Sequence, residues 1–182
     1  MHARRMRIAW FVHGRGKGHS VRTLAALPSF DAHDVALFGG GEARVMLAHE
    51  PRFTPVETVV PGASVIVRFP RRLRADLARL ESFAPDVVIS DGDGPSVFAA
   101  RTLGVPAIAM SHGLIFGHTA LPESLPRLAI LRERINAASA SLPASRRIAV
   151  HFAALSPTTP GTIVARPDPR PGLARRANDG HL

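Results

Sequence analysis

The chain has 182 residues, of which 46% are hydrophobic, which is enough for one domain with a sizeable core and short for two. It contains no cysteine, which excludes disulfides, thiol catalysis and cysteine-based metal sites. The net charge is +9, yet Lys17 is the only lysine among 23 basic residues, and the arginines are scattered without a nucleic-acid-binding motif. We therefore expect no nucleic-acid partner; the charge favours acidic membrane surfaces or phosphorylated substrates instead.

Apolar runs alternate with helix-like patterns along most of the chain. Strands are predicted at residues 7–12, 34–38, 54–60, 64–69, 86–90, 106–110 and 147–152. Helices are predicted at residues 20–27, 42–49, 71–83, 95–103 and 123–141. This alternation is typical of an α/β fold, here a single Rossmann-like domain whose parallel sheet has helices on both faces.

The character of the sequence changes after residue 155. Five prolines fall within fifteen residues, around one short apolar run at 162–165. We expect a domain at residues 1–155, followed by a linker or tail rich in Pro and Arg at 156–182. No apolar run approaches the roughly 20 residues of a membrane span, and the run at 8–12 is too short for a signal peptide. We therefore expect a cytoplasmic protein.

A glycine-rich loop joins the first predicted strand to the first predicted helix. Gly14, Gly16 and Gly18 alternate in it, and His19 follows at the start of the helix. Strand, glycine turn and helix in this order direct backbone N–H groups and a helix N-terminus toward a ligand. A histidine at that place can take a proton from a hydroxyl near neutral pH. His19 is therefore a candidate general base, the alternative being that it caps the helix together with Ser20.

The fifth and sixth predicted strands also end in reactive side chains. Asp91 and Asp93 follow the first of these strands, and His112 follows the second. Because the carboxyl ends of parallel strands meet at one edge of a sheet, we expect these side chains to converge with the glycine loop. Asp91 and Asp93 are candidates for contacts to the reacting groups, or else they form a turn and cap the next helix. His112 is a candidate for substrate binding, or else it bonds to a neighbouring backbone group.

Basic residues around the loop fit no familiar nucleotide motif. Arg22, on the first helix turn, points back to the site or out to solvent, and His13 is expected to be structural. Arg15 and Lys17 could meet a phosphate, although solvated loop charges are more usual. The P-loop pattern fails because Lys17 lies between two glycines and is followed by Gly-His-Ser. The dinucleotide fingerprint fails on glycine spacing and on the acidic residue after the second strand, which leaves a dinucleotide enzyme as a weaker alternative.

The segment Gly14-x-Gly-x-Gly-His19-x-x-Arg22 resembles the start of GT-B glycosyltransferases, in the branch of the N-acetylglucosaminyltransferase of lipid II synthesis and the UDP-glycosyltransferases. A second match runs from Pro85-Asp-Val-Val-Ile-Ser-Asp-Gly-Asp93 to Ala99-Ala-Arg-Thr-Leu-Gly-Val-Pro-Ala-Ile-Ala-Met-Ser-His112. It is similar to the pattern Pro-Asp-hydrophobic-Ser-Asp, Ala-Ala-x-x-x-Gly-Ile-Pro, His in those proteins. The resemblance covers about residues 6–166 and implies the N-terminal half of the GT-B fold.

That half holds the acceptor in GT-B enzymes, and the resemblance implies roles for the site residues. His19 would serve as general base or contact the reacting centre, and Asp91 would orient the base or lie near the acceptor. The three loop glycines would border the donor diphosphate. We also expect substrate contacts from Asp93, His112 and Arg22.

The donor nucleotide sugar binds mainly to the C-terminal half of these enzymes. The resemblance therefore implies a truncated product or a subunit that needs a partner half. The nucleotide sugar would be a co-substrate, with no resident cofactor or metal, and the hydroxyl acceptor would be a lipid, a glycan or a small molecule.

We thus expect the acceptor-binding half of an inverting, nucleotide-sugar-dependent glycosyltransferase. The alternative is a non-catalytic half-domain that binds a glycan, a lipid or a protein partner. The predicted last helix places Leu128, Leu131 and Ile135 near one face. We expect this face to pack on the sheet, the alternative being peripheral contact with the inner face of a membrane.

Overall fold

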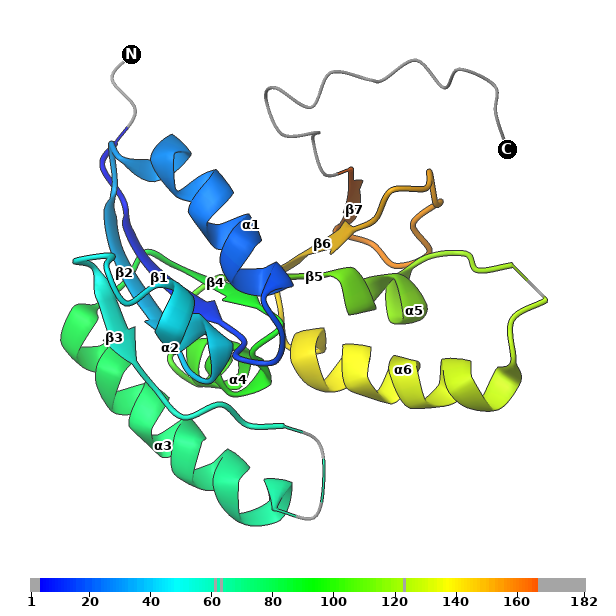
Figure 1. Cartoon of the computed structure of the whole chain (residues 1–182), viewed down its shortest axis with the longest axis horizontal. Helices are drawn as coiled ribbons and strands as arrows, with labels where there is room; N and C mark the ends of the chain where they lie inside the picture. Colours follow the sequence, from blue (N-terminus) through cyan, green and yellow to red (C-terminus); the bar gives the residue numbers. More distant parts are fainter. Residues whose placement is uncertain (1–3, 61, 63, 123, 167–182) are drawn as a thin grey trace.

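A twisted sheet of parallel strands lies at the centre of the molecule (Figure 1). The computed structural model describes residues 4–60, 62, 64–122 and 124–166. Within these residues the strand order is β3-β2-β1-β4-β5-β6-β7, and every neighbouring pair is parallel. The strands are β1 (Arg7–Val12), β2 (Asp34–Gly39), β3 (Phe53–Pro55), β4 (Val87–Asp91), β5 (Ala107–Ser111), β6 (Arg146–Val150) and β7 (Thr162–Ala165). The predicted α/β class with a parallel sheet is confirmed.

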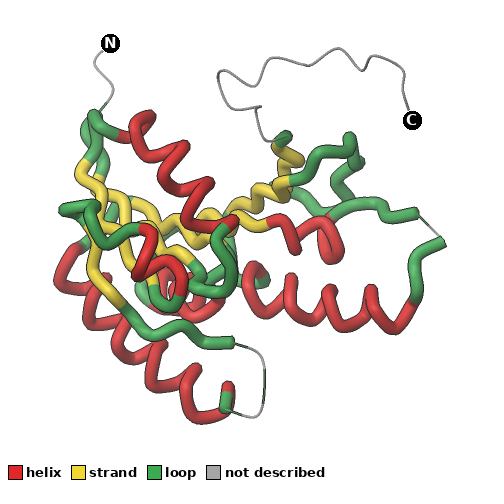
Figure 2. Tube along the Cα trace, viewed as in Figure 1, coloured by secondary structure: helices red, strands yellow, loops and turns green. Residues whose placement is uncertain are grey.

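Helices cover both faces of this sheet (Figures 1 and 2). One face carries α1 (Gly18–Ala26), the 3-10 helix η1 (Leu27–Phe30) and α2 (Glu42–Met46). The other face carries α3 (Val65–Phe83), α4 (Gly94–Thr102) and α6 (Arg127–Ser141). Two short helices connect β5 to α6, namely η2 (His112–Leu114) and α5 (Ile115–His118).

Alternate side chains of β1 enter two separate cores. Ile8, Trp10 and Val12 pack with residues of η1 and α2, whereas Ala9 and Phe11 pack with residues of α3 and α4. All five are at most 2% exposed. Burial on both faces is what an internal strand of a parallel sheet requires, and it explains why the sequence of β1 is continuously apolar.

The chain leaves β1 and β4 toward opposite faces, although these strands are neighbours in the sheet. β1 leads into α1, and β4 leads into α4. Such a switch point opens a crevice at the carboxyl edge of the sheet, where α/β proteins bind ligands. The His13 N–H donates to the Asp91 carbonyl at 3.0 Å, which ties the two strand ends together. The fold therefore places the glycine loop beside the Asp-Gly-Asp turn.

The region between β3 and β4 differs from the prediction. The strand predicted at 54–60 is reduced to the short β3, and the strand predicted at 64–69 is wrong, because these residues form the first turns of α3. The β-branched run at its start has the composition of a strand. However, Ile66 and Val67 are 78% and 72% exposed, so the alternation of buried and exposed side chains that marks a strand is missing.

β7 lengthens the sheet beyond the predicted boundary at residue 155. It pairs with β6 from Arg147↔Thr162 to Val150↔Ala165. The prolines that flank this short apolar run place it in a tail when the sequence is read alone, but the sheet edge provides a partner for its backbone. Residues 167–182 of the predicted tail lie outside the described residues.

α6 begins later than predicted and does not lay its apolar residues on the sheet. Leu128, Leu131 and Ile135 are 84%, 55% and 62% exposed, whereas Ala137 and Ser141 are buried. The expectation that the leucine and isoleucine side chains pack on the sheet is therefore wrong; small residues make that contact instead. Among the described helices, none has the length and apolar character needed to span a bilayer.

Candidate functional site

His19 and Asp91 meet in the crevice between β1 and β4. His19 Nδ1 lies 2.6 Å from Asp91 Oδ1, and the aspartate side chain is 0% exposed while that of His19 is 21% exposed. Because a carboxylate only accepts hydrogen bonds, the proton lies on Nδ1, and Nε2 keeps its lone pair when the imidazole is neutral. Asp91 therefore holds the ring in the form that can accept a proton.

Arg22 binds the same carboxylate. Its Nε donates to Asp91 Oδ2 at 3.0 Å, and its Nη2 contacts Oδ1. Two-point contact between guanidinium and carboxylate is the strongest geometry of this pair. It fixes Asp91 and balances a charge that would be costly to bury alone. The Arg22 side chain therefore points toward the site and not out to solvent, and it contributes there by holding Asp91.

Gly92 makes room for the imidazole of His19. Its φ is +75°, and a Cβ added there would lie 2.8 Å from His19 Cε1 and 3.3 Å from His13 Cβ. The left-handed backbone and the close ring together select glycine at this position. The sequence analysis did not single out Gly92; the Asp-Gly-Asp-Gly run was the signal available for it.

The glycine loop has a packed part and an open part. A Cβ on Gly14 would overlap the Gly40 carbonyl oxygen and the Thr58 hydroxyl, so this position requires close backbone approach. A Cβ on Gly16 or Gly18 would meet no atom within 4 Å. Gly14 is therefore needed for packing, whereas the other two glycines leave open space in which a ligand can approach.

The N-terminus of α1 is free of side-chain caps. Lys17 occupies the capping position, and its side chain makes no capping hydrogen bond. The first N–H groups of a helix lack partners within the helix and carry a partial positive charge. This end of α1 begins at Gly18, directly beside His19, so it adds positive potential to the crevice.

His13 is half-buried and stabilises the glycine loop. Its Nε2 lies 3.3 Å from the Val59 carbonyl, and its Nδ1 accepts from the Arg15 N–H at 3.1 Å. Burial lowers the pKa of His13. The neutral tautomer with the proton on Nε2 satisfies both contacts, and it connects the glycine loop to the segment that precedes α3. This geometry agrees with the structural role expected for His13.

Asp93 caps α4 and does not face the crevice. Its carboxylate accepts from the Ser96 N–H at 3.3 Å and lies 3.2 Å from Arg72 Nη2. Asp93 is 2% exposed. The structure thus places Asp93 in the capping role that the sequence left open, and Asp91 is the aspartate of this turn that reaches His19.

A buried ionic cluster around Arg72 stabilises the Asp-Gly-Asp turn. Arg72 is 2% exposed and donates from Nε to Asp76 Oδ1 at 2.9 Å, as well as to the Glu57 carbonyl. Burial raises the pKa of Asp76 to about 6. The sequence analysis missed the cluster, although an arginine and an aspartate four residues apart on a predicted helix were its signal.

His112 lies outside the crevice. Its Nδ1 is 3.1 Å from the Val150 carbonyl, and its ring stacks on His151 with centroids 5.2 Å apart. This is the backbone contact that the sequence left open as the alternative to substrate binding. The flanking residues Ser111 and Gly113, rather than His112, line the cavity beside His19.

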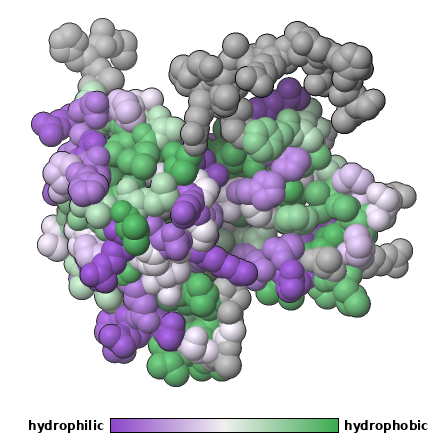
Figure 3. Space-filling model, in the orientation of Figure 1, coloured by the Kyte–Doolittle hydropathy of each residue, from purple (hydrophilic) through white to green (hydrophobic). Residues whose placement is uncertain are grey.

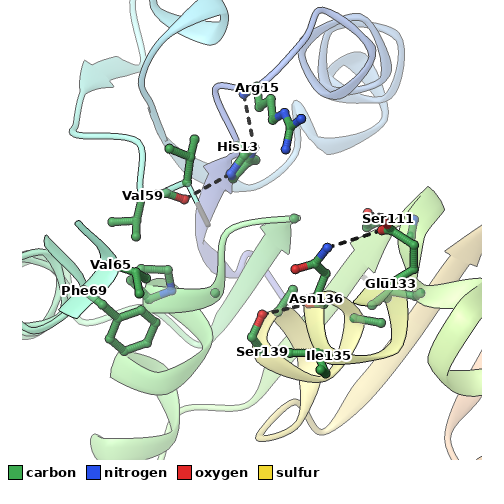
Figure 4. Close-up of a pocket in the computed structure, with 18 of the residues that line it drawn as sticks. His13, Arg15, Val59, Val65, Phe69, Ser111, Glu133, Ile135, Asn136 and Ser139 are labelled. Carbon is green, nitrogen blue, oxygen red and sulfur yellow. Dashed lines mark hydrogen bonds between the residues drawn. The ribbon is translucent and has the colours of Figure 1, made fainter. Parts of the chain in front are cut away.

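A cavity of about 410 Å³ opens beside His19 (Figure 4). One side of the cavity is apolar and is formed by Val59, Val65 and Phe69. The other side is polar and is formed by three residues of α6, namely Glu133, Asn136 and Ser139. Asn136 Nδ2 donates to Glu133 Oε2 at 3.4 Å. Nothing in the sequence pattern separates these α6 residues from ordinary surface residues, so the sequence analysis missed this wall.

The sequence matches no protein-family model and no curated protein. Solved structures do resemble the fold. The UDP-GlcNAc 2-epimerase of Neisseria meningitidis, bound to UDP-GlcNAc, matches 79% of this chain and 40% of its own, with a TM-score of 0.59 and 14% identity. MurG of Acinetobacter baumannii matches 80% of this chain and 41% of its own, with a TM-score of 0.56 and 17% identity.

A third similar structure is MnaA of S. aureus with UDP, at a TM-score of 0.56, 14% identity, and coverage of 79% of this chain and 39% of its own. The fold is that of a GT-B half-domain. This confirms the fold that the two sequence motifs predict. The chain spans about two-fifths of the length of these structures.

Proposed function

We propose that this chain is the acceptor-binding half of an inverting glycosyltransferase that uses a nucleotide sugar. The observation that carries the proposal is the His19–Asp91 pair, 2.6 Å apart at the edge of a cavity. A second Rossmann-like half, in a longer chain or in a partner, would supply the donor site. The two motifs and the GT-B fold support this division of labour.

The reaction assigns one proton transfer to His19. An acceptor hydroxyl in the cavity would give its proton to His19 Nε2 while its oxygen attacks C1 of the sugar. The bond from C1 to the nucleoside diphosphate breaks, and attack from the opposite side inverts C1. Asp91 stabilises the imidazolium that forms, since its carboxylate accepts from Nδ1.

The leaving diphosphate would lie against the open part of the glycine loop. Gly16 and Gly18 leave space on that side, and the uncapped start of α1 presents N–H groups with partial positive charge. Backbone dipoles of this kind stabilise charge that develops in a transition state. The nucleotide sugar is a co-substrate in this scheme, and no step calls for a resident cofactor or metal.

The surface of α6 supports a further part of the proposal, namely peripheral contact with an anionic membrane that carries a lipid acceptor. Leu128, Leu131 and Ile135 are exposed, and Arg132 lies among them with a side chain that is 78% exposed. Figure 3 shows apolar side chains at the surface over α6 and at the start of α3. Apolar and cationic residues together favour an anionic interface. Co-sedimentation with anionic and neutral vesicles tests this contact.

Sugar transfer by the two halves together tests the main proposal. We expect His19→Ala to lower kcat about 10²- to 10⁴-fold, the usual contribution of a general base. His49→Ala is the matched control, because His49 is an exposed histidine in the turn that follows α2. Near-normal transfer by His19→Ala would contradict the base assignment. Stoichiometric acceptor binding without any turnover would favour the non-catalytic alternative.

A further inference from the structure

A second cavity, of about 530 Å³, is lined by residues 55–58, which directly precede the Val59 and Val60 that line the His19 cavity. It is bounded by α2, by residues 55–58 and by α3, and it shares no lining residue with the first cavity. We call it the arginine groove, because four arginines line it: Arg44, Arg71, Arg72 and Arg79. Glu57 is the only carboxylate in its lining among the described residues.

Two of these arginines are already engaged. Arg72 donates to Asp76, to Asp93 and to the Glu57 carbonyl, which uses all three of its nitrogens. Arg79 donates from Nη1 to Asp76 at 3.2 Å, and its other nitrogens remain available. Arg72 and Arg79 therefore form the structural side of the groove, with part of their charge balanced.

Arg44 and Arg71 are the unbalanced charges. Both are exposed, and neither guanidinium makes a hydrogen bond or an ion pair within the described part of the chain, although the Arg44 backbone N–H donates to the Gly41 carbonyl. Glu57 is the nearest opposing charge in the lining, and it lies 3.7 Å from Arg68. Together, the groove and its contacts hold five arginines against three carboxylates, which leaves a positive excess concentrated on α2 and α3.

The wall of the groove also holds a polar group without a partner. The Thr58 hydroxyl lines the groove, and its oxygen is buried with no hydrogen-bond partner among the described residues. Buried polar atoms without partners are rare in folded proteins, and they mark places where a bound group or water completes the site. Figure 3 shows hydrophilic side chains gathered over α3, beside this groove.

We propose that the arginine groove binds a phosphate or diphosphate group of a small molecule, at a site separate from the His19 cavity. Several converging guanidinium groups match the oxygen geometry of phosphate, which can accept paired N–H donors from each of them. The inference is independent of the proposed transferase activity, since it concerns residues that touch neither His19 nor Asp91.

Calorimetric titration of the chain with inorganic pyrophosphate tests the site. We expect Arg44→Gln and Arg71→Gln each to weaken binding about tenfold, the loss of one charge-assisted contact. Arg101→Gln is the matched control. Arg101 is exposed on α4 and does not line the groove, so this substitution removes the same charge from another part of the surface. Unchanged melting temperatures would show that the groove variants remain folded.

Titration with two further compounds distinguishes a nucleotide from a sugar phosphate as the ligand. Uridine diphosphate binding more tightly than pyrophosphate, with the same loss in the groove variants, assigns the groove to a nucleotide. Glucose 1-phosphate binding more tightly assigns it to a sugar phosphate. The proposal is overturned if pyrophosphate does not bind at millimolar concentration, or if the groove variants and the Arg101 control weaken binding equally.

Discussion

Replacement of Gly92 by alanine probes the geometry that places His19. The residue has a φ of +75°, and the new Cβ would lie 2.8 Å from His19 Cε1. An L side chain in the left-handed region costs roughly 1–2 kcal/mol, and overpacking against the ring adds roughly 1–3 kcal/mol. We therefore expect Gly92→Ala to lower the free energy of unfolding by about 2–5 kcal/mol.

Gly104 offers a matched control for the backbone part of this cost. Its φ is +70°, and a Cβ added there would meet no atom within 4 Å. Gly104→Ala should therefore lose only the roughly 1–2 kcal/mol of left-handed strain. The difference between the two variants isolates the contact with His19.

Urea unfolding followed by Trp10 fluorescence measures both variants, since Trp10 is the only tryptophan and is 1% exposed. Imidazole nitrogen signals in ¹H–¹⁵N spectra report whether His19 moves. We expect them to shift in Gly92→Ala and to stay in place in Gly104→Ala. Equal destabilisation of the two variants, with His19 signals unchanged in both, would show that Gly92 does not position the His19 ring.

Three further predictions concern the carboxylates and their partners. Asp91→Asn should lower kcat for sugar transfer about 10²- to 10⁴-fold, because the proton on His19 Nδ1 loses its charged acceptor. The unfolding curve of this variant should remain native-like. Initial rates that fall less than threefold would contradict the prediction. Arg72→Met should cost about 3–5 kcal/mol in urea unfolding, because it removes the buried partner that Asp76 and Asp93 share. Arg79→Gln, at a side chain that is 30% exposed, should cost under about 1 kcal/mol. The pKa of Asp76 is raised to about 6, so its protonation favours the folded state at low pH, and this contribution is lost as the pH rises toward 6. Asp76→Asn should therefore gain stability relative to the wild type between pH 4 and 7, by about 3 kcal/mol in total, and a difference independent of pH would contradict the assignment.

The elements that the sequence predicts well are those whose pattern fits one kind of structure. β1, β4 and β5 each contain an apolar run that fits a sheet with helices on both faces, and a glycine lies in the turn that follows each of them. The same pattern places His19 and Asp91 at one edge of the sheet. Their hydrogen bond, by contrast, depends on the register of β1 with β4, in which Val12 pairs with Asp91.

The parts that the sequence does not predict depend on tertiary contacts. The start of α3 has the composition of a strand but forms a helix, whereas residues 162–165 form β7 by pairing with β6. Asp91 and Asp93 are equivalent by sequence, and only the fold shows that one reaches His19 and the other caps α4. The polar wall from α6 is likewise set by packing between helices.

Proton NMR of a running reaction determines whether sugar transfer inverts C1 and whether it requires His19. The two halves together would be incubated with UDP-N-acetylglucosamine and candidate hydroxyl acceptors, with and without His19→Ala. We expect a new glycoside whose configuration at C1 is opposite to that of the donor, formed only when His19 is present. A product with retained configuration at C1, or a donor converted at C2 without any acceptor, would contradict this expectation.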